Sequence, residues 1–202
     1  GNLVLPDGIT FIGDGAFKDC YKFTGDLILP DSITTLGGTT TKDGCFYYCK
    51  GLNGTLKLPN GITSVPAFTF YNCNFTGQLE IPSSVTTIDD RAFYSCDFTG
   101  VLEIPEGATN IGNYVFSFNN ITTVIIPNSV TDVGNNCFYS CNKLSKLYIG
   151  NSITTLGDAC FYAGKNIPTK LYTTNEVVKN YDWAGDNRTI LPINTFTFAL
   201  PQ

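Results

Sequence analysis

The chain has 202 residues, carries a net charge of −5 and contains no histidine, which excludes imidazole-based catalysis and histidine-ligated metal sites. Its 12 Lys and Arg residues are too few to form a large basic patch, so we expect neither nucleic acid nor an anionic membrane as a partner. Aromatic residues reach 13%, which indicates a folded protein. Charged residues reach only 14%, so we expect Thr, Asn, Gly and Tyr to form most of its hydrated surface.

The chain opens with GNLVLPDG, which has neither the basic start nor the apolar run of a signal peptide. No later stretch approaches the roughly 18 consecutive apolar residues that a membrane helix needs, so we expect no membrane insertion. Because methionine is absent even at position 1, we interpret the sequence as a mature or shortened piece of a longer product.

A short pattern, Leu-x-(Leu/Ile)-Pro, recurs along the whole chain. The repeats that it opens start at Leu3, Leu27, Leu56, Leu79, Leu102, Val124, Leu147 and Leu171. A unit of about 23 residues cannot bury its own apolar face, but stacked copies bury it against one another, which predicts a solenoid. We therefore divide the chain into seven repeats over residues 1–170 and a last strand with a C-terminal cap over residues 171–202.

Each repeat is predicted to contain three elements. The alternation in Leu-x-(Leu/Ile) predicts a strand in which Leu3 and Leu5 point inward while Val4 points outward. Equivalent strands of successive repeats should pair in parallel, which gives a right-handed solenoid with one parallel β-sheet of seven or eight strands. The sequence Ile-Thr-x-(Ile/Leu)-Gly predicts a second short extended piece, and x-Ala-Phe-x-x-Cys predicts a single helical or 3₁₀ turn.

Three columns of the repeat are nearly constant. The Phe column, which we predict to be core, comprises Phe17, Phe46, Phe70, Phe93, Phe116, Phe138 and Phe161. The Thr column comprises Thr10, Thr34, Thr63, Thr86, Thr109, Thr131 and Thr154. The Cys column comprises Cys20, Cys49, Cys73, Cys96, Asn119, Cys141 and Gly164. We expect each Thr to bond its neighbours in an extended stretch, and an ice-binding array is disfavoured because the position after each Thr is irregular.

Eight cysteines raise the alternative of disulfides or a metal site. Five of them stand in the Cys column, and Cys45, Cys137 and Cys160 directly precede a column Phe. A small, weakly polar thiol suits both buried places, so we predict free core thiols, with a disulfide left open only for Cys137 and Cys160. Since no Cys-x-x-Cys is present, we predict no metal site and no cofactor.

The complete pattern, L-x-[LI]-P-x-x-[IV]-T-x-[IL]-G-x-x-A-F-x-x-C-x-x-[LF], resembles the BspA-like (Treponema pallidum type) leucine-rich repeats of bacterial cell-surface proteins. The resemblance covers about residues 3–170 in seven tandem matches. It implies an α/β-type leucine-rich repeat solenoid, an extracellular setting, and attachment or protein binding instead of catalysis. The family often ends in a helix containing Tyr and Trp, which residues 175–183 match.

The chain departs from this pattern in the links between repeats and at its ends. An extra residue predicts a Gly-permitted bulge at residues 23–25, 52–54, 75–77 and 98–100, whereas the link at 144–146 is tighter. Residues 38–42 are an insertion in the second repeat, which we predict to be a loop. The N-terminal end has no lid, so Leu3 and Leu5 should lie at an open end.

The C-terminal segment is predicted to form a helical cap. Thr174 or Asn175 can cap a short amphipathic helix, whose Val177, Val178 and Tyr181 share a face that could cover the last repeat. Residues 195–198 alternate like a further strand.

The outward positions of the main sheet are the candidate binding face. Their central row is Val4, Ile28, Lys57, Glu80, Glu103, Ile125, Tyr148 and Tyr172, and the row beside it ends in Thr123, Lys146 and Lys170. We expect Lys57 to pair with Glu80, and Glu80 to stack on Glu103 as a like charge. The predicted binding residues are Glu80, Glu103, Ile125, Tyr148 and Tyr172. In the alternative interpretations, the charges are merely solvated and the cap covers the tyrosines.

These features favour an extracellular, bacterial cell-surface binding or adhesion module that is monomeric and binds a protein or glycan. The acidic chain favours a partner of basic or apolar character. A structural spacer that displays another domain of a longer surface protein is the rival interpretation. Glu80 and Glu103 lie on an open sheet and nothing marks a nucleophile, so we predict no catalytic residue and no enzyme.

Overall fold

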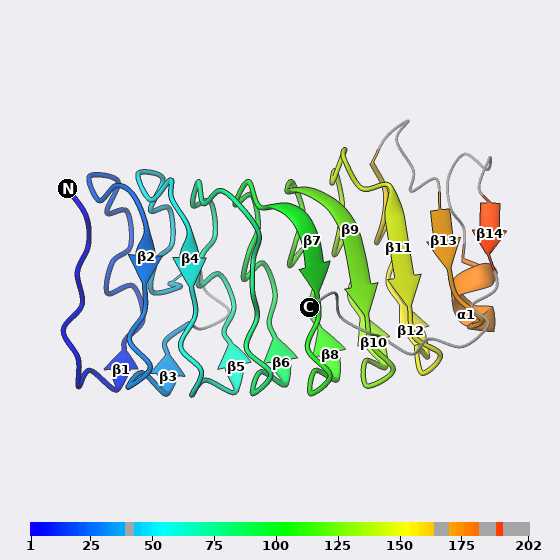
Figure 1. Ribbon diagram of the computed structural model, residues 1–202, viewed down its shortest axis with the longest axis horizontal. Helices are drawn as coiled ribbons and strands as arrows, with labels where there is room; N and C mark the ends of the chain where they lie inside the picture. The colour runs from blue at the N-terminus through cyan, green and yellow to red at the C-terminus, as the bar shows by residue number, and fades with distance from the viewer. Residues whose placement is uncertain (39–42, 164–169, 182–188, 192–202) are drawn as a thin grey trace, which may run out of the picture.

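Successive repeats lie side by side along one axis, so the molecule is an elongated parallel β-solenoid of about seven turns (Figure 1). This computed structural model describes residues 1–38, 43–163, 170–181 and 189–191. The first repeats form one end, and strands β13 (Lys170–Tyr172) and β14 (Thr189–Leu191) form the other. The predicted repeat solenoid is therefore confirmed.

The Leu-x-(Leu/Ile) strands form the main sheet, the upper row of arrows in Figure 1. Its strands before β13 are β2 (Leu27–Ile28), β4 (Leu56–Lys57), β7 (Thr99–Glu103), β9 (Asn120–Ile126) and β11 (Lys146–Ile149). β2 pairs with β4, a single bridge joins Lys57 to Glu80, and β7, β9, β11, β13 and β14 pair in that order, all in parallel. The strands are parallel as expected, but no ladder joins the segment of Glu80 to β7, so this row is two pieces and not one continuous sheet of seven or eight strands.

A second row of parallel strands runs along the lower edge in Figure 1. Its strands are β1 (Phe11–Ile12), β3 (Thr35–Leu36), β5 (Ser64–Val65), β6 (Thr87–Ile88), β8 (Asn110–Ile111), β10 (Asp132–Val133) and β12 (Thr155–Leu156). β1 pairs with β3, and β5, β6, β8, β10 and β12 form one five-stranded sheet. The sequence pattern predicted these extended pieces, but it did not reveal that they pair into a sheet of their own.

The segment around each column Phe is a hydrogen-bonded turn instead of a helix. Near Phe93, two N–H groups bond within the turn, as Tyr94 N–H does to the Arg91 carbonyl at 3.3 Å. The alternate N–H groups, those of Arg91, Phe93 and Ser95, donate to the next repeat at 2.9 to 3.1 Å. Arg91 and Ser95 reach it by adopting left-handed backbone angles, with φ of 57° and 54°. Each turn therefore adds a third line of hydrogen bonds between repeats.

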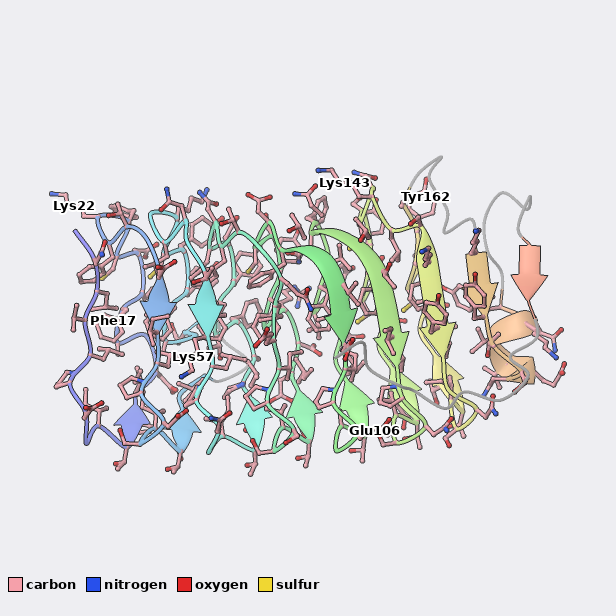
Figure 2. The ribbon with its side chains drawn as sticks, viewed as in Figure 1. Phe17, Lys22, Lys57, Glu106, Lys143 and Tyr162 are labelled. Atoms are coloured by element: carbon pink, nitrogen blue, oxygen red, sulfur yellow. The ribbon has the colours of Figure 1, made fainter. Side chains whose placement is uncertain are left out.

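The Phe column is a continuous stack through the core. Neighbouring ring centroids lie 5.1 to 5.6 Å apart, with interplanar angles of 5 to 14°. Phe17, labelled in Figure 2, starts the stack at the N-terminal end. The strand alternation is equally clear: Leu27 and Leu29 are fully buried, whereas Ile28 between them is 49% exposed. The predicted core column and the inward leucines are confirmed.

Three of the four predicted glycine bulges have the backbone angle that requires glycine. Gly25, Gly77 and Gly100 have φ values of 80°, 81° and 75°. Next to Gly100, the register between β7 and β9 shifts by one residue. Gly54 is the exception, because its backbone is not left-handed; it is kept small by close approach to the previous repeat, where a Cβ would lie 2.6 Å from the Gly25 carbonyl carbon.

The C-terminal cap begins with the short helix α1 (Glu176–Lys179). The Asn175 side chain caps it by accepting a hydrogen bond from Val178 N–H at 3.1 Å. Val178 is fully buried, and the Tyr181 hydroxyl donates to the Gly157 carbonyl at 2.8 Å. The prediction for Val177 is wrong, since it is 42% exposed: adjacent residues point about 100° apart around a helix, and Val178 takes the buried side. The strand predicted at 195–198 lies outside the described residues, as do residues 39–42 of the predicted loop.

Replacing Phe93 by alanine should lower the free energy of unfolding by about 3–5 kcal/mol. The substitution removes a buried ring that stacks on Phe70 and Phe116. Denaturant unfolding followed by circular dichroism measures the change. Phe11→Ala is the matched control, because Phe11 is 58% exposed, and it should cost less than about 1 kcal/mol. A comparably small effect at Phe93 would mean that the column is not the core.

Gly134→Ala should destabilise the protein by about 1–3 kcal/mol. An added Cβ would lie 2.6 Å from the carbonyl carbon of Gly112 in the previous repeat, so the backbones could not remain at their present spacing. Gly61→Ala is the control, because there the nearest atom is 3.4 Å away. Thermal unfolding of both variants tests this, and equal melting temperatures would show that the close approach carries no constraint.

Candidate binding face

The outward side of the main sheet brings part of the predicted binding row together as a ladder. Glu103 on β7, Ile125 on β9, Tyr148 on β11 and Tyr172 on β13 are successive register partners. Their side chains project outward because the flanking residues of each strand, such as Leu147 and Ile149, are buried. Four of the five predicted residues therefore form one continuous row.

Glu80 is less closely joined to this row. It pairs with Lys57 through a single parallel bridge and lies in no strand, whereas Glu103 ends β7. The expected ion pair is not formed: Lys57 and Glu80 are both exposed, and their charged groups do not come within ion-pair distance. Exposed charges gain little from pairing, because water screens their attraction and ordering two long side chains costs entropy. Figure 2 shows Lys57 on the front of the main sheet, beside β4.

The C-terminal end of the row is aromatic. The rings of Tyr148 and Tyr172 stack with centroids 4.4 Å apart and an interplanar angle of 9°. Partial burial raises the pKa of the Tyr148 hydroxyl above its usual value, and Tyr172 adds to the shift through its charge and through a side-chain hydrogen bond. Tyr148 is therefore a neutral phenol at physiological pH. The rings of Tyr148 and Tyr172 give this surface an apolar part, and their hydroxyls give it a polar part.

The helix of the cap does not cover the two tyrosines. α1 packs against β12 of the second sheet, and Tyr148 and Tyr172 both stay partly exposed. Both rings therefore keep solvent-exposed surface on the outward face of β11 and β13.

A second aromatic surface, which was not predicted from the sequence, lies on the turns that carry the Phe column. Its rings form an unbroken series of contacts, with centroids 4.7 to 5.6 Å apart: Tyr47, Tyr71, Tyr94, Phe118, Tyr139 and Tyr162. Cations lie over neighbouring rings, and the Arg91 guanidinium is 4.6 Å from the centre of Tyr114. The signal was present in the sequence, because a Tyr follows the column Phe in five of the seven repeats.

A groove of about 750 Å³ lies at the N-terminal end, between residues 2–7 and β2. Val4 and Ile28 give it exposed apolar surface, and Asp7, Asp26 and Asp31 lie along it. Residues 3–5 form no ladder with β2, and the groove lies between these two segments. The sequence repeat predicted a strand at Leu3–Leu5, but none is formed, and both leucines are only partly buried.

The Cys column is a column of hydrogen-bond donors to the main chain. The thiols of Cys73, Cys96 and Cys141 donate to carbonyls of Phe-column residues in neighbouring repeats at 2.9 to 3.2 Å. Asn119 fills the same position and donates its amide to the Phe93 carbonyl at 2.9 Å. A small donor is thus what the site requires, which explains why Asn can replace Cys.

All eight cysteines are free, including Cys137 and Cys160. The sequence leaves a disulfide open for that pair, and the structure has free thiols there. Among the described residues, no group of three or more Cys, Asp or Glu side chains is placed to hold a metal ion. Within the same ranges, no helix combines the length and the hydropathy that crossing a membrane requires.

The stacked short repeats, the parallel ladder of Leu-x-(Leu/Ile) strands and the buried Phe column define a leucine-rich repeat solenoid. The family model for the BspA type leucine rich repeat region matches residues 1–41 and 39–168 in six copies, so the chain belongs to this family. A comparison with curated proteins gives no match.

Solved structures support the fold. A Treponema pallidum leucine-rich repeat protein is similar with a TM-score of 0.64 and 21% identity, over 81% of this chain and 74% of that one. A leucine-rich repeat protein from Eubacterium ventriosum is similar with a TM-score of 0.51 and 19% identity, over 73% of this chain and 53% of that one. At these identities, the likeness concerns the fold alone.

Alkaline pH should destabilise the protein through its buried thiols. Burial raises the pKa of Cys45, Cys49 and Cys141 from 9.0 to about 12. These thiols ionise in the unfolded chain first, so their contribution to stability is complete below about pH 9 and is lost as the pH rises toward 12.

Alkylation at about pH 8 tests the burial of the thiols directly: the half-buried Cys20 should react in the native protein, and the other seven only after unfolding. Rapid native alkylation of several thiols would contradict this.

Proposed function

We propose that the chain is an extracellular binding or adhesion module of a bacterial cell surface. It acts as a monomer without catalytic activity and binds a protein or glycan through Glu80, Glu103, Ile125, Tyr148 and Tyr172. The observation that carries this proposal is the stacked, partly exposed Tyr148–Tyr172 pair at the end of the outward row. The inward leucines are buried in the core, whereas these tyrosines stay partly exposed, and Tyr is a frequent anchor of interfaces.

The scaffold suits such a role. β7, β9, β11 and β13 hold the outward row by backbone pairing on a rigid sheet, so little ordering entropy is lost when a partner binds. A row that changes from carboxylates at Glu80 and Glu103 to rings at Tyr148 and Tyr172 offers both polar and apolar contacts. The cell-surface setting is supported by the family, whose BspA-like repeats occur in bacterial surface proteins.

A structural spacer is the second candidate, and the Thr column favours it. Thr86, Thr131 and Thr154 each donate a hydroxyl hydrogen bond to a Thr carbonyl of the previous repeat at 3.1 to 3.3 Å. This side of the solenoid repeats the same polar contact and shows no local specialisation. A uniform contact of this kind suits a long, stiff spacer. The outward row of the main sheet differs, because its residue type changes from repeat to repeat.

The double substitution Tyr148→Ala and Tyr172→Ala should abolish binding and leave the melting temperature nearly unchanged. Both rings are partly exposed on the sheet and contribute little to the core. A panel of purified glycans and extracellular proteins, screened by surface plasmon resonance, supplies the ligand, and calorimetry supplies the melting temperature.

Tyr21→Ala with Tyr162→Ala is the matched control, because these tyrosines are 63% and 40% exposed but lie off the main sheet. The control should bind like the unaltered protein. If the control loses binding while the sheet-face variant keeps it, the site lies on the turns instead. If the unaltered protein binds nothing on a broad panel, the spacer is favoured.

A further inference from the structure

Two lysines lie beside the stacked tyrosines on the outward face of the main sheet. Lys146 and Lys170 are register partners on β11 and β13, and each stands two residues before a tyrosine. Because side chains alternate along a strand, Lys146 projects from the same face as Tyr148, and Lys170 from the same face as Tyr172. We name these four residues the Lys–Tyr patch.

The two ammonium groups of the patch have no carboxylate partner in the part of the chain that the structure describes, and both lysines are exposed. Elsewhere, Lys18 pairs with Asp43 at 3.1 Å and Lys179 with Glu176 at 2.7 Å. Like charges directly across two paired strands repel each other. An anion bound between them removes this repulsion, so the patch has an electrostatic reason to take a negative group.

The backbone beneath the patch leaves no edge for a peptide. β11 lies between β9 and β13, and β13 lies between β11 and β14, so each strand is paired on both sides. A peptide could not add here as a further strand, and its own amide groups would find few partners. Recognition must therefore use side chains alone.

A sugar chain matches the side chains that are present. Its ring faces are apolar and its edges carry hydroxyls, which fits the rings and hydroxyls of Tyr148 and Tyr172. A sugar carboxylate fits two neighbouring ammonium groups, because charge-assisted hydrogen bonds are the strong ones. Thr123, the register partner of Lys146 on β9, adds a further hydroxyl at the edge.

We infer that the Lys–Tyr patch is a subsite for a carboxylate-bearing polysaccharide. Lys146 and Lys170 bind the carboxylate, and the tyrosines contact the adjoining sugar ring. The inference rests on the proposed function and narrows its partner. It also gives the partner a negative charge, whereas the net charge of the chain predicted a basic or apolar partner. The electrostatic field at the contact surface, and not the net charge, decides which partner binds.

Binding of polygalacturonate tests the inference, with neutral dextran and poly-L-glutamate as comparison probes. Calorimetric titration should show that the protein binds polygalacturonate and that raising NaCl from about 0.05 to 0.3 M weakens this binding. Lys146→Gln with Lys170→Gln should reduce the affinity roughly tenfold or more. Lys22→Gln with Lys57→Gln removes the same charge from the N-terminal repeats, where both lysines are exposed, and should change affinity less than about twofold.

The outcomes separate the inference from the proposed function. Equal binding of dextran, equal loss in the two lysine variants, or no polygalacturonate binding at all overturns the inference. Stronger binding of poly-L-glutamate than of the polysaccharide also overturns it and indicates an acidic protein partner. If the tyrosine double variant loses another ligand while the lysine variant keeps it, the binding face stands and the carboxylate subsite does not.

Discussion

The stacking of each residue on its counterpart in the next repeat is the constraint on which the whole structure depends. A repeat of about 23 residues has no interior of its own, so its Phe ring becomes core only when the neighbouring rings cover both faces. The ring spacing of 5.1 to 5.6 Å is close to the spacing of paired strands, about 4.8 Å, and both ladders can therefore persist together. The close approach of Gly134 to Gly112 follows from the same spacing, because a Cβ there has no room.

This constraint also explains the polar part of the interior. A stacked backbone leaves donors and acceptors at the same place in every repeat, and each must be satisfied in the same way. The thiols of the Cys column meet one such need by donating to the carbonyls of Phe-column residues, and Asn119 meets it with an amide. The left-handed residues near each column Phe satisfy a second set of backbone groups, because their N–H groups donate hydrogen bonds to the next repeat. Strain of about 1–2 kcal/mol at a non-glycine residue is offset there by a hydrogen bond and a packed ring.

What the sequence could predict follows from which features repeat. Phe93, Leu102 and Thr86 recur in register, so their columns could be identified without coordinates. The pairing of Thr87 with Asn110 in the second sheet could not, because its outward residues change type from repeat to repeat. Predictions for single residues failed for local reasons: Val177 points about 100° away from the buried Val178 around the helix, and Lys57 and Glu80 are both exposed, so their charges gain little from pairing. At the candidate site, the row of residues was predictable, whereas the stacking of Tyr148 on Tyr172 and the isolation of Lys146 and Lys170 needed the structure.

The length of the strands in the main sheet differs along the solenoid, and the candidate face from Glu103 to Tyr172 lies where the strands are longest. β2 and β4 have two residues each, whereas β7 has five, β9 seven and β11 four. Gly25 and Gly77 have left-handed angles in the early links, whereas Gly100 with the same angle lies within β7, where the pairing with β9 shifts by one residue. The links into β9 and β11 lack such a glycine, and β9 pairs with β11 over four residues without a register shift, including Ile125 and Tyr148. The longer ladder holds these outward side chains at fixed separation, which is the property that a multi-point contact with an extended ligand requires.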